Sequence, residues 1–123
     1  MKITRLDAFG LLAVLQALDG IQREGRFEPY TFTPAVVDKV VENVLLLQKL
    51  AAEAKAYEAE VMRLYTARED PSSAQSLIQE WVAKEVDLPL HPITKAELDP
   101  ARNPIPISFR VRLTRLDEPA PTA

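Results

Sequence analysis

One long stretch, from Thr33 to Arg68, limits what this chain can fold into more than any other feature. Thr33 is a residue type that caps helix N-termini, and Pro34 fits the first helical position, where its missing N–H leaves no bond unmade. No glycine or proline follows until Pro71. Apolar residues recur there in steps of three and four, at Val37, Val40, Val44, Leu47, Ala51, Ala54, Val61 and Tyr65. The pattern predicts one helix of about nine turns over residues 34–68, with Glu58 as an exposed break in its apolar seam.

The first half of this predicted helix is apolar around more than half of its circumference. The residues concerned are Val36, Val37, Val40, Val41, Val44, Leu45, Leu47 and Leu50. A helix of this kind must be covered on more than one side. Leu46 also interrupts the polar face. We therefore expect Leu46 and Leu50 to remain exposed and to contact a partner.

A shorter helix is predicted before the long one. Its apolar residues recur at helical spacing, at Ala8, Leu11, Leu12, Leu15 and Leu18. Asp7 is the expected N-cap and Gly20 the expected residue after the C-terminus. Gly10 lies inside the pattern and costs about 1 kcal/mol relative to alanine, for which a close helix approach and chance are equal explanations. The two helices are expected to form an antiparallel hairpin, preceded by a short strand over residues 1–5.

Residues 20–32 connect the two predicted helices and carry three aromatic rings, at Phe27, Tyr30 and Phe32. One interpretation is a loop that closes the core with its rings, because aromatic side chains bury large areas. The other is a binding lip. The pattern favours the loop.

The chain after the long helix first predicts a third helix. Leu77, Ile78, Trp81 and Val82 have helical spacing, and Trp81 is expected at the packing interface. After Glu85 the apolar period changes to two, and prolines restrict residues 86–92 to an edge strand or an extended tether.

The C-terminal part then predicts one turn and one strand. The segment from Thr94 to Glu97 has the pattern of a capping box on one helical turn. Strict alternation predicts a strand whose apolar face comprises Ile105, Ile107, Phe109, Val111 and Leu113.

We therefore expect an α+β fold, mainly an α-helical hairpin with a long central helix, a third helix and a small C-terminal β element. Residues 1–116 are expected to form a single domain at this length. Residues 117–123 are rich in proline and alanine, and we expect them to be disordered.

No apolar run approaches the length of a membrane span. Residues 8–15 faintly resemble a signal peptide, but a buried helix is the favoured interpretation.

The residue patterns of this sequence predict no catalytic residue, no cofactor and no metal. The chain has no cysteine and one histidine, His91, which lies between prolines without a metal-ligand pattern. Its three glycines form no phosphate-binding loop, and its serines have no adjacent base. The net charge of −3 argues against a general nucleic-acid binder. We expect a protein that is not an enzyme.

Arg110 and Arg112 share one face of the predicted strand, and Lys2 would join them if the terminal strands paired. Such a face can contact phosphate or an acidic partner, although the exposed face of a half-buried sheet has the same pattern. The candidate partner-binding residues are Tyr30, Phe32, Leu46, Leu50, Arg110 and Arg112.

The stretch from Leu6 to Tyr65 resembles an uncharacterised family of small phage and prophage proteins. The resemblance rests on a short leucine-rich helix followed by a long helix, with Asn43-Val44-Leu45 and Lys55-Ala56-Tyr57-Glu58 in the long one. Residues 85–90 and the turn at residues 94–97 also fit the family pattern. It implies a viral accessory protein and no catalytic residues.

We therefore expect a phage protein that acts through protein–protein contacts in virion or tail assembly. The alternative is a small phage-encoded inhibitor of a host machine, such as a polymerase or a defence complex. The expected partner is a viral structural protein or a host protein, and the expected location is the host cytoplasm or the virion. We also expect a homo-oligomer, with the long helix at or near the contact and its exposed apolar side chains as the interface.

Overall fold

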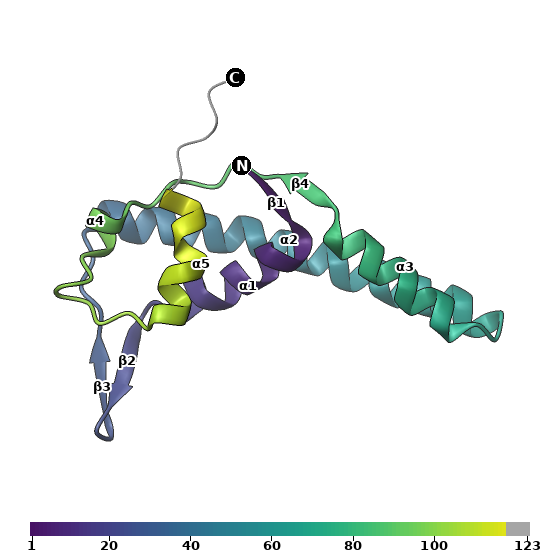
Figure 1. Cartoon of the computed structure of the whole chain (residues 1–123), viewed down its shortest axis with the longest axis horizontal. Coiled ribbons are helices and arrows are strands. Elements are labelled where there is room, and N and C mark those ends of the chain that lie inside the picture. The colour runs from purple at the N-terminus through teal and green to yellow at the C-terminus, as the bar shows by residue number, and fades with distance from the viewer. Residues whose placement is uncertain (118–123) are drawn as a thin grey trace.

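The computed structural model describes residues 1–117, which are mostly helical with two small antiparallel sheets (Figure 1). In chain order the elements are β1 (Lys2–Thr4), α1 (Arg5–Gln16), β2 (Gly20–Arg23), β3 (Arg26–Pro29), α2 (Pro34–Ala67), α3 (Pro71–Ala83), β4 (Glu85–Asp87), α4 (Lys95–Leu98) and α5 (Ile107–Asp117). The mainly helical α+β class is confirmed. Of the predicted disordered tail, 117–123, only Asp117 is described, as the last residue of α5; the rest lies outside the described residues.

Helix α2 runs along the length of the molecule, and the other helices lie beside it (Figure 1). Thr33 is its N-cap, because the Thr33 hydroxyl accepts a hydrogen bond from the N–H of Val36. Pro34 occupies the first turn, where a missing N–H is tolerated. The helix ends at Ala67, so the predicted span is confirmed to within one residue. Glu58 is exposed, as its position in the pattern predicted.

The buried face of α2 is rotated from the predicted seam. It comprises Val36, Asn43, Leu47, Leu50, Ala54 and Val61, whereas Val37 of the predicted seam is exposed. The reason is a polar residue. The Asn43 side chain accepts a hydrogen bond from the His91 N–H at 2.7 Å and donates to the His91 carbonyl at 3.0 Å. The extended segment before α4 therefore crosses α2 at Asn43, on a side that apolar periodicity alone does not mark.

Helix α1 packs against the first half of α2, and its N-terminus is set by Thr4 rather than by the predicted Asp7. The Thr4 hydroxyl accepts a hydrogen bond from the Asp7 N–H at 3.1 Å. The predicted N-terminal strand is confirmed as β1, which pairs antiparallel with β4 in the register Ile3 to Val86. Residues 86–92 were expected to form an edge strand or an extended tether; Val86 and Asp87 belong to β4, and residues 88–92 lie outside any strand.

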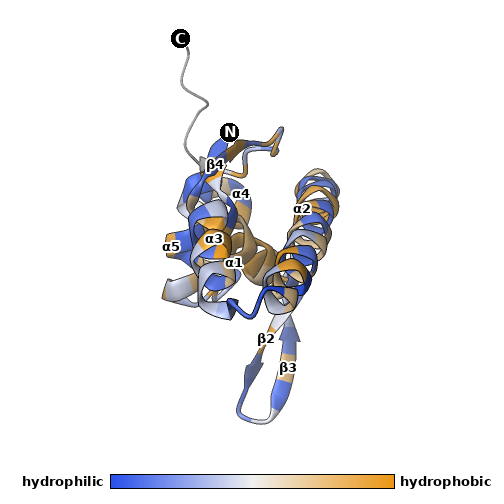
Figure 2. Cartoon of the chain, turned by 90° about the vertical axis from the view of Figure 1, so that its right-hand side faces the viewer, coloured by the Kyte–Doolittle hydropathy of each residue, from blue (hydrophilic) through white to orange (hydrophobic). Residues whose placement is uncertain are grey.

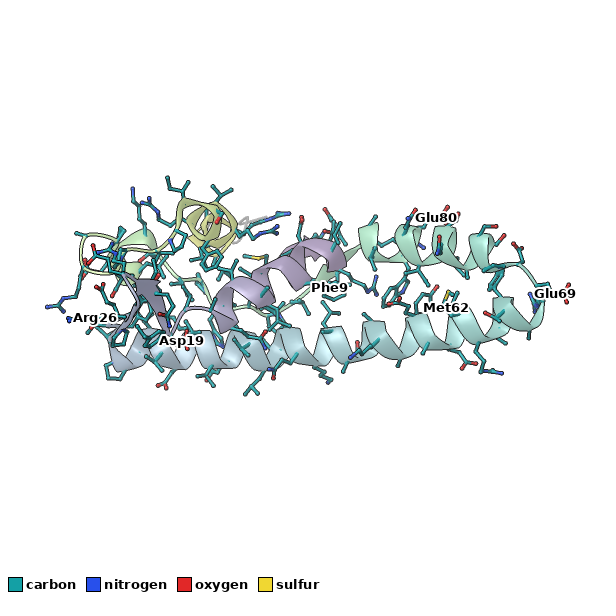
Figure 3. All side chains as sticks on the ribbon, turned by 90° about the horizontal axis from the view of Figure 1, so that it is seen from below. Phe9, Asp19, Arg26, Met62, Glu69 and Glu80 are labelled. Carbon is teal, nitrogen blue, oxygen red and sulfur yellow. The ribbon has the colours of Figure 1, made fainter. Side chains whose placement is uncertain are left out.

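Helix α3 begins at the N-cap Asp70 and runs antiparallel beside the second half of α2, with Glu69 at the turn between them and Met62 between the two helices (Figure 3). Trp81 stacks on Tyr57 of α2 with ring centroids 4.1 Å apart and planes 15° apart. The Arg5 guanidinium covers the same indole ring at 3.9 Å from its centroid. Trp81 therefore lies at the junction of α1, α2 and α3, which confirms the predicted third helix and its packing interface.

The predicted C-terminal strand is wrong, because residues 107–117 form the helix α5. The N–H groups of Phe109 and Arg110 both donate to the Pro106 carbonyl at 3.0 Å, which starts the helix. Phe109, Leu113 and Leu116 are four and three residues apart, and they pack in or against the core. The capping box at Thr94 and Glu97 is confirmed on the short helix α4.

The connection between α1 and α2 is a β-hairpin, which the sequence interpretation as a loop missed. Strands β2 and β3 pair antiparallel, and Glu24 and Gly25 at the turn both have positive φ, of 49° and 77°. Two positive φ values in a two-residue turn are typical of type I′ hairpins. Gly20 is the first residue of β2, and the C-cap of α1 is Ala17. The hairpin projects away from the helices (Figures 1 and 2).

One main core lies between α1, the first half of α2, the segment around α4, and α5. Its buried apolar residues are Ile3, Ala8, Leu11, Val14, Leu15, Leu18, Val36, Leu47, Leu50, Leu90, Ile93, Leu98, Ile105, Leu113 and Leu116. Phe9 contributes from α1 toward α2 (Figure 3). The second half of α2 is covered by α3 instead.

Candidate interaction surface

Two of the candidate partner-binding residues, Tyr30 and Phe32, lie partly buried against the core. Their ring centroids are 6.0 Å apart in an edge-to-face arrangement. The Tyr30 hydroxyl donates a hydrogen bond to the Pro104 carbonyl at 3.1 Å. Burial raises the pKa of Tyr30, with Arg23 opposing the rise and Asp19 adding to it. These contacts are typical of a segment that closes the core rather than of a binding lip.

The two candidate leucines of α2 are not the exposed ones. Leu50 is 7% exposed and belongs to the core, so the expectation that it stays exposed is wrong. Leu46 is partly buried and packs against the core. Both lie toward the side of α2 on which Asn43 binds the extended segment. The rotation of the buried face therefore covers them and uncovers other apolar residues.

The uncovered residues form a line along the face of α2 opposite the core. Val37, Val41 and Leu45 are 45%, 50% and 61% exposed. At about 100° per residue, three exposed alanines continue the same line. We call the six residues the α2 stripe: Val37, Val41, Leu45, Ala52, Ala56 and Ala59. Figure 2 shows α1, α3 and α5 on one side of α2, so within residues 1–117 no helix covers the stripe side.

The predicted cationic face of Lys2, Arg110 and Arg112 does not form. Lys2 lies on β1, whose partner strand is β4 rather than residues 105–114. Arg110 and Arg112 are two residues apart on a helix, so they point to different sides of α5. Arg112 lies against Gly10 of α1, where a Cβ atom would collide with its guanidinium. The Arg112 side chain, rather than the backbone of a second helix, therefore lies closest to Gly10.

The β2–β3 hairpin adds an exposed aromatic residue, Phe27, which is half exposed. Its ring lies over Gly20, on the same face of the ribbon, where a Cβ atom would be only 2.5 Å from it. An aromatic ring over a glycine is a known device for stabilising a strand pair. Phe27 therefore has a structural partner within the hairpin.

His91 contacts the Glu42 carboxylate through Nε2, and its backbone bonds to Asn43. A histidine–carboxylate pair acts as a base when it also reaches a nucleophile or a water. Within residues 1–117, the polar contacts of His91 go only to Glu42 and Asn43. The pair therefore holds the extended segment on α2.

Across 1–117, no group of three or more histidine, cysteine, aspartate or glutamate side chains is arranged to hold a metal ion. No helix in the same range combines the length and the apolar composition that crossing a membrane requires.

Comparisons with family models, with curated proteins and with solved structures found no match to this chain. The main candidate surface is the α2 stripe, a line of exposed apolar side chains about 33 Å long at 1.5 Å per residue.

Proposed function

We propose that this protein acts by binding other proteins, and that its first partner is a second copy of itself. The observation that carries the proposal is the α2 stripe, where three exposed branched side chains lie on the outer face of the longest helix. Exposed apolar surface of this kind marks interaction sites on soluble proteins. The stripe has large residues in its first half and alanines in its second half.

That division makes the stripe complementary to itself. In an antiparallel pair with a twofold axis near Gln48, Val37 faces Ala59, Val41 faces Ala56 and Leu45 faces Ala52 of the second copy. Each large side chain then meets a small one, which allows the two helices to approach closely and to interdigitate. A twofold interface uses the same patch on both subunits, and this patch satisfies that condition.

The proposed setting is a viral one, and its support is the resemblance of residues 6–65 to small phage proteins. In that setting the dimer would be a non-enzymatic accessory protein in virion or tail assembly. The helical hairpin of α1 and the first half of α2 would be the rigid unit that presents the stripe. The second candidate is an inhibitor of a host machine, in which a monomer would offer the same stripe to a host protein.

Sedimentation velocity at micromolar concentration tests the self-association. We expect a dimer of the 13.8 kDa chain. Leu45→Glu should convert it to a folded monomer, because a buried unpaired charge at the interface is costly. The matched control is Leu6→Glu, since Leu6 is 62% exposed on α1, off the stripe, and Leu45 is 61% exposed. The control should remain dimeric.

A wild-type chain that sediments as a monomer at these concentrations would contradict the dimer. It would also shift the proposal to the inhibitor, in which the stripe binds a host protein. A dimer that both glutamate variants weaken equally would contradict the α2 stripe as the contact. A dimer that neither variant weakens would place the interface elsewhere on the molecule.

A further inference from the structure

A second exposed surface lies on α5, on the other side of the molecule from the α2 stripe (Figure 2). It differs from the stripe in charge. Helix α5 carries the exposed side chains Arg110, Arg112 and Arg115 in a chain whose net charge is −3. Arg115 is paired with Asp7 of α1 at 3.0 Å, whereas neither Arg110 nor Arg112 forms an ion pair with another described residue. The surface is therefore cationic in an acidic protein.

This cationic surface also has an apolar ridge. Ile107 and Val111 are one helical turn apart and are 71% and 65% exposed, which makes them the most exposed large apolar residues described in residues 1–117. They do not contribute to the core, because α5 packs inward through Phe109, Leu113 and Leu116 instead. Water hydrates Ile107 and Val111 unfavourably. An apolar ridge beside exposed arginines is therefore a candidate interaction surface.

A hollow lies on each side of the ridge, and Val111 lines both. The hollow toward α4 has a volume of about 230 Å³, an apolar floor that includes Ile93 and Leu98, and Lys95 and Arg110 among its lining residues. Among the residues that the structure describes, no carboxylate lines it. The floor residues are buried, while both cations are exposed and stand at the surface.

The second hollow lies toward α1 and has a volume of about 450 Å³. Its apolar residues include Leu11, and Arg112 and the Arg115–Asp7 pair line it. The two hollows therefore share one plan, with an apolar interior and arginines at the edge. Together with the ridge they form one continuous face.

We propose that this face of α5 is a docking site for an acidic, amphipathic segment of another protein. Apolar side chains of the partner would enter the hollows on either side of Val111, and its carboxylates would meet Arg110, Lys95 and Arg112. Charge complementarity selects this partner, because attraction between opposite surface charges steers association and sets specificity. The inference rests on the proposed function, protein binding, and adds a partner other than a second copy.

The geometry favours a peptide over other anions. The hollow with the all-cationic edge is smaller than the roughly 300–1,000 Å³ of small-molecule pockets, and it suits one or two side chains. The larger hollow has the Asp7 carboxylate in its lining, which disfavours a small anion there. A bilayer surface requires a continuous apolar helix face, but α5 exposes only Ile107 and Val111 and packs its other apolar face into the core. Single-stranded nucleic acid requires exposed stacking rings, and the one ring of α5, Phe109, packs against the core.

Fluorescence anisotropy with the full chain tests the proposal. The probes are three labelled helical peptides of about five turns. The first has leucines at every third or fourth position and glutamates elsewhere, the second replaces the glutamates by lysines, and the third replaces the leucines by alanines. We expect the acidic leucine peptide to bind, more weakly as salt is added, and the other two not to bind.

Variants then assign the binding to α5. Arg110→Gln should weaken the acidic peptide about fivefold, the upper range for one exposed ion pair. Val111→Asp should abolish binding, and circular dichroism should show an unchanged fold because Val111 is exposed. The matched control is Arg26→Gln at the hairpin tip (Figure 3), where an exposed arginine lies far from α5. It should bind as the wild type does.

Several outcomes would overturn the docking site. They are equal binding of acidic and lysine peptides, no binding of the acidic peptide, and binding that Arg110→Gln and Arg26→Gln change alike. Binding to phosphatidylglycerol vesicles in place of the peptide would assign the face to a membrane. Leu45→Glu should bind the peptide normally, so a failure of the dimer and a failure of the α5 site are distinguishable.

Discussion

At the scale of single residues, amide side chains position the irregular segments of this chain. Asn43 and Asn103 are its only asparagines, and both are fully buried. The Asn103 side-chain amide donates hydrogen bonds to the carbonyls of Thr31 and Leu98 and accepts one from the Thr31 N–H. The Asn43 side-chain amide donates to the backbone carbonyl of His91 and accepts from its N–H. One amide can serve as donor and acceptor together. It therefore satisfies buried backbone that has no strand partner.

These contacts could not be predicted from the sequence. Asn43 lies among valines and leucines, so a search for apolar periodicity treats it as an interruption of the pattern. Asn103 precedes a proline, which predicts a turn but no partner in residue 31, far away along the chain. The hydrogen bonds of the Asn43 side chain nevertheless decide which face of α2 is buried, and therefore which of its leucines are exposed.

A charged residue of α4 supplies the first prediction. The Glu97 carboxylate accepts a hydrogen bond from Lys39 of α2 at 2.8 Å and closes the capping box with Thr94. The Lys39 contact first, and then the Thr94 backbone N–H, lower the pKa of Glu97. A lowered carboxyl pKa stabilises the fold above its ordinary value of about 4.3, and this stability is lost as the pH falls through the folded value.

Glu97→Gln should therefore cost about 0.5–1 kcal/mol at pH 7, and this cost should shrink toward zero as the pH falls through the folded pKa, which lies below about 4.3. Glutamine keeps the capping box, so only the charge is lost. Glu97→Ala should lose about 1 kcal/mol more, and this second loss should persist at low pH. Urea unfolding at several pH values measures both differences. A gap between wild type and Glu97→Gln that widens on acidification would contradict the assignment.

At the scale of elements, helix-capping residues predicted the helices that they start, whereas apolar spacings that fit both a helix and a strand led to a wrong prediction. The caps Thr33 and Thr94 are local, and both elements that they start were predicted. The helix α5 was missed because Phe109 and Leu113 fit period two and helical spacing equally. The burial of Leu116, which the strand interpretation left out, and the exposure of Ile107 and Val111, which it placed on the apolar face, separate the two.

The hairpin β2–β3 was missed for a different reason. Its turn residues, Glu24 and Gly25, are not the Asn-Gly or Asp-Gly pairs that mark type I′ turns most clearly. The two strands also lack a clean alternation of apolar and polar residues, because Gly20 has no side chain and the Phe27 ring covers it instead. The glycine at the turn was the one available signal.

Helix α1 supplies the second prediction, through Gly10. Alanine in place of a glycine inside a helix stabilises by about 1 kcal/mol when the site accepts the methyl group. The atom nearest the new Cβ is the guanidinium end of Arg112, a flexible and exposed side chain that can move aside. Gly10→Ala should therefore raise the free energy of unfolding by about 0.5–1 kcal/mol. A loss of stability would show that Arg112 is held rigidly between α1 and α5.

The contact between α1 and α2 supplies the third prediction. Leu47 is almost fully buried in the core, and its replacement by alanine leaves a cavity between the helices. Leu47→Ala should cost about 2–5 kcal/mol in denaturant unfolding. The control is Leu6→Ala, since Leu6 is mostly exposed, and it should cost less than about 0.5 kcal/mol. A cost for Leu47→Ala below about 1 kcal/mol would contradict tight packing between α1 and α2.

At the scale of the whole molecule, the sequence predicted an excess of apolar surface on α2 but misplaced it. The excess follows from composition alone, because the nine valines and leucines in its first half exceed what one short helix can cover. Their placement depends on the segment that Asn43 binds, and on α5, neither of which was predicted. Val37, Val41 and Leu45 therefore replace Leu46 and Leu50 as the exposed residues.

The last prediction concerns the stability of the assembled protein. A dimer forms only from folded chains, so association stabilises the fold and makes the unfolding midpoint rise with protein concentration. For a chain of this size, each tenfold rise in concentration above the dissociation constant should raise the midpoint by about 2–4 °C. Thermal unfolding followed by circular dichroism over a wide concentration range measures the rise.

The variants decide which surface causes this dependence. Leu45→Glu should unfold at one temperature at every concentration, equal to that of the dilute wild-type chain, because the monomer loses no core contact there. Leu6→Glu should keep the wild-type slope. A wild-type midpoint independent of concentration would mean that folded copies do not associate. A slope that survives in Leu45→Glu would mean that they associate through a surface other than the α2 stripe, and the size match between its valines and alanines would then have no role in assembly.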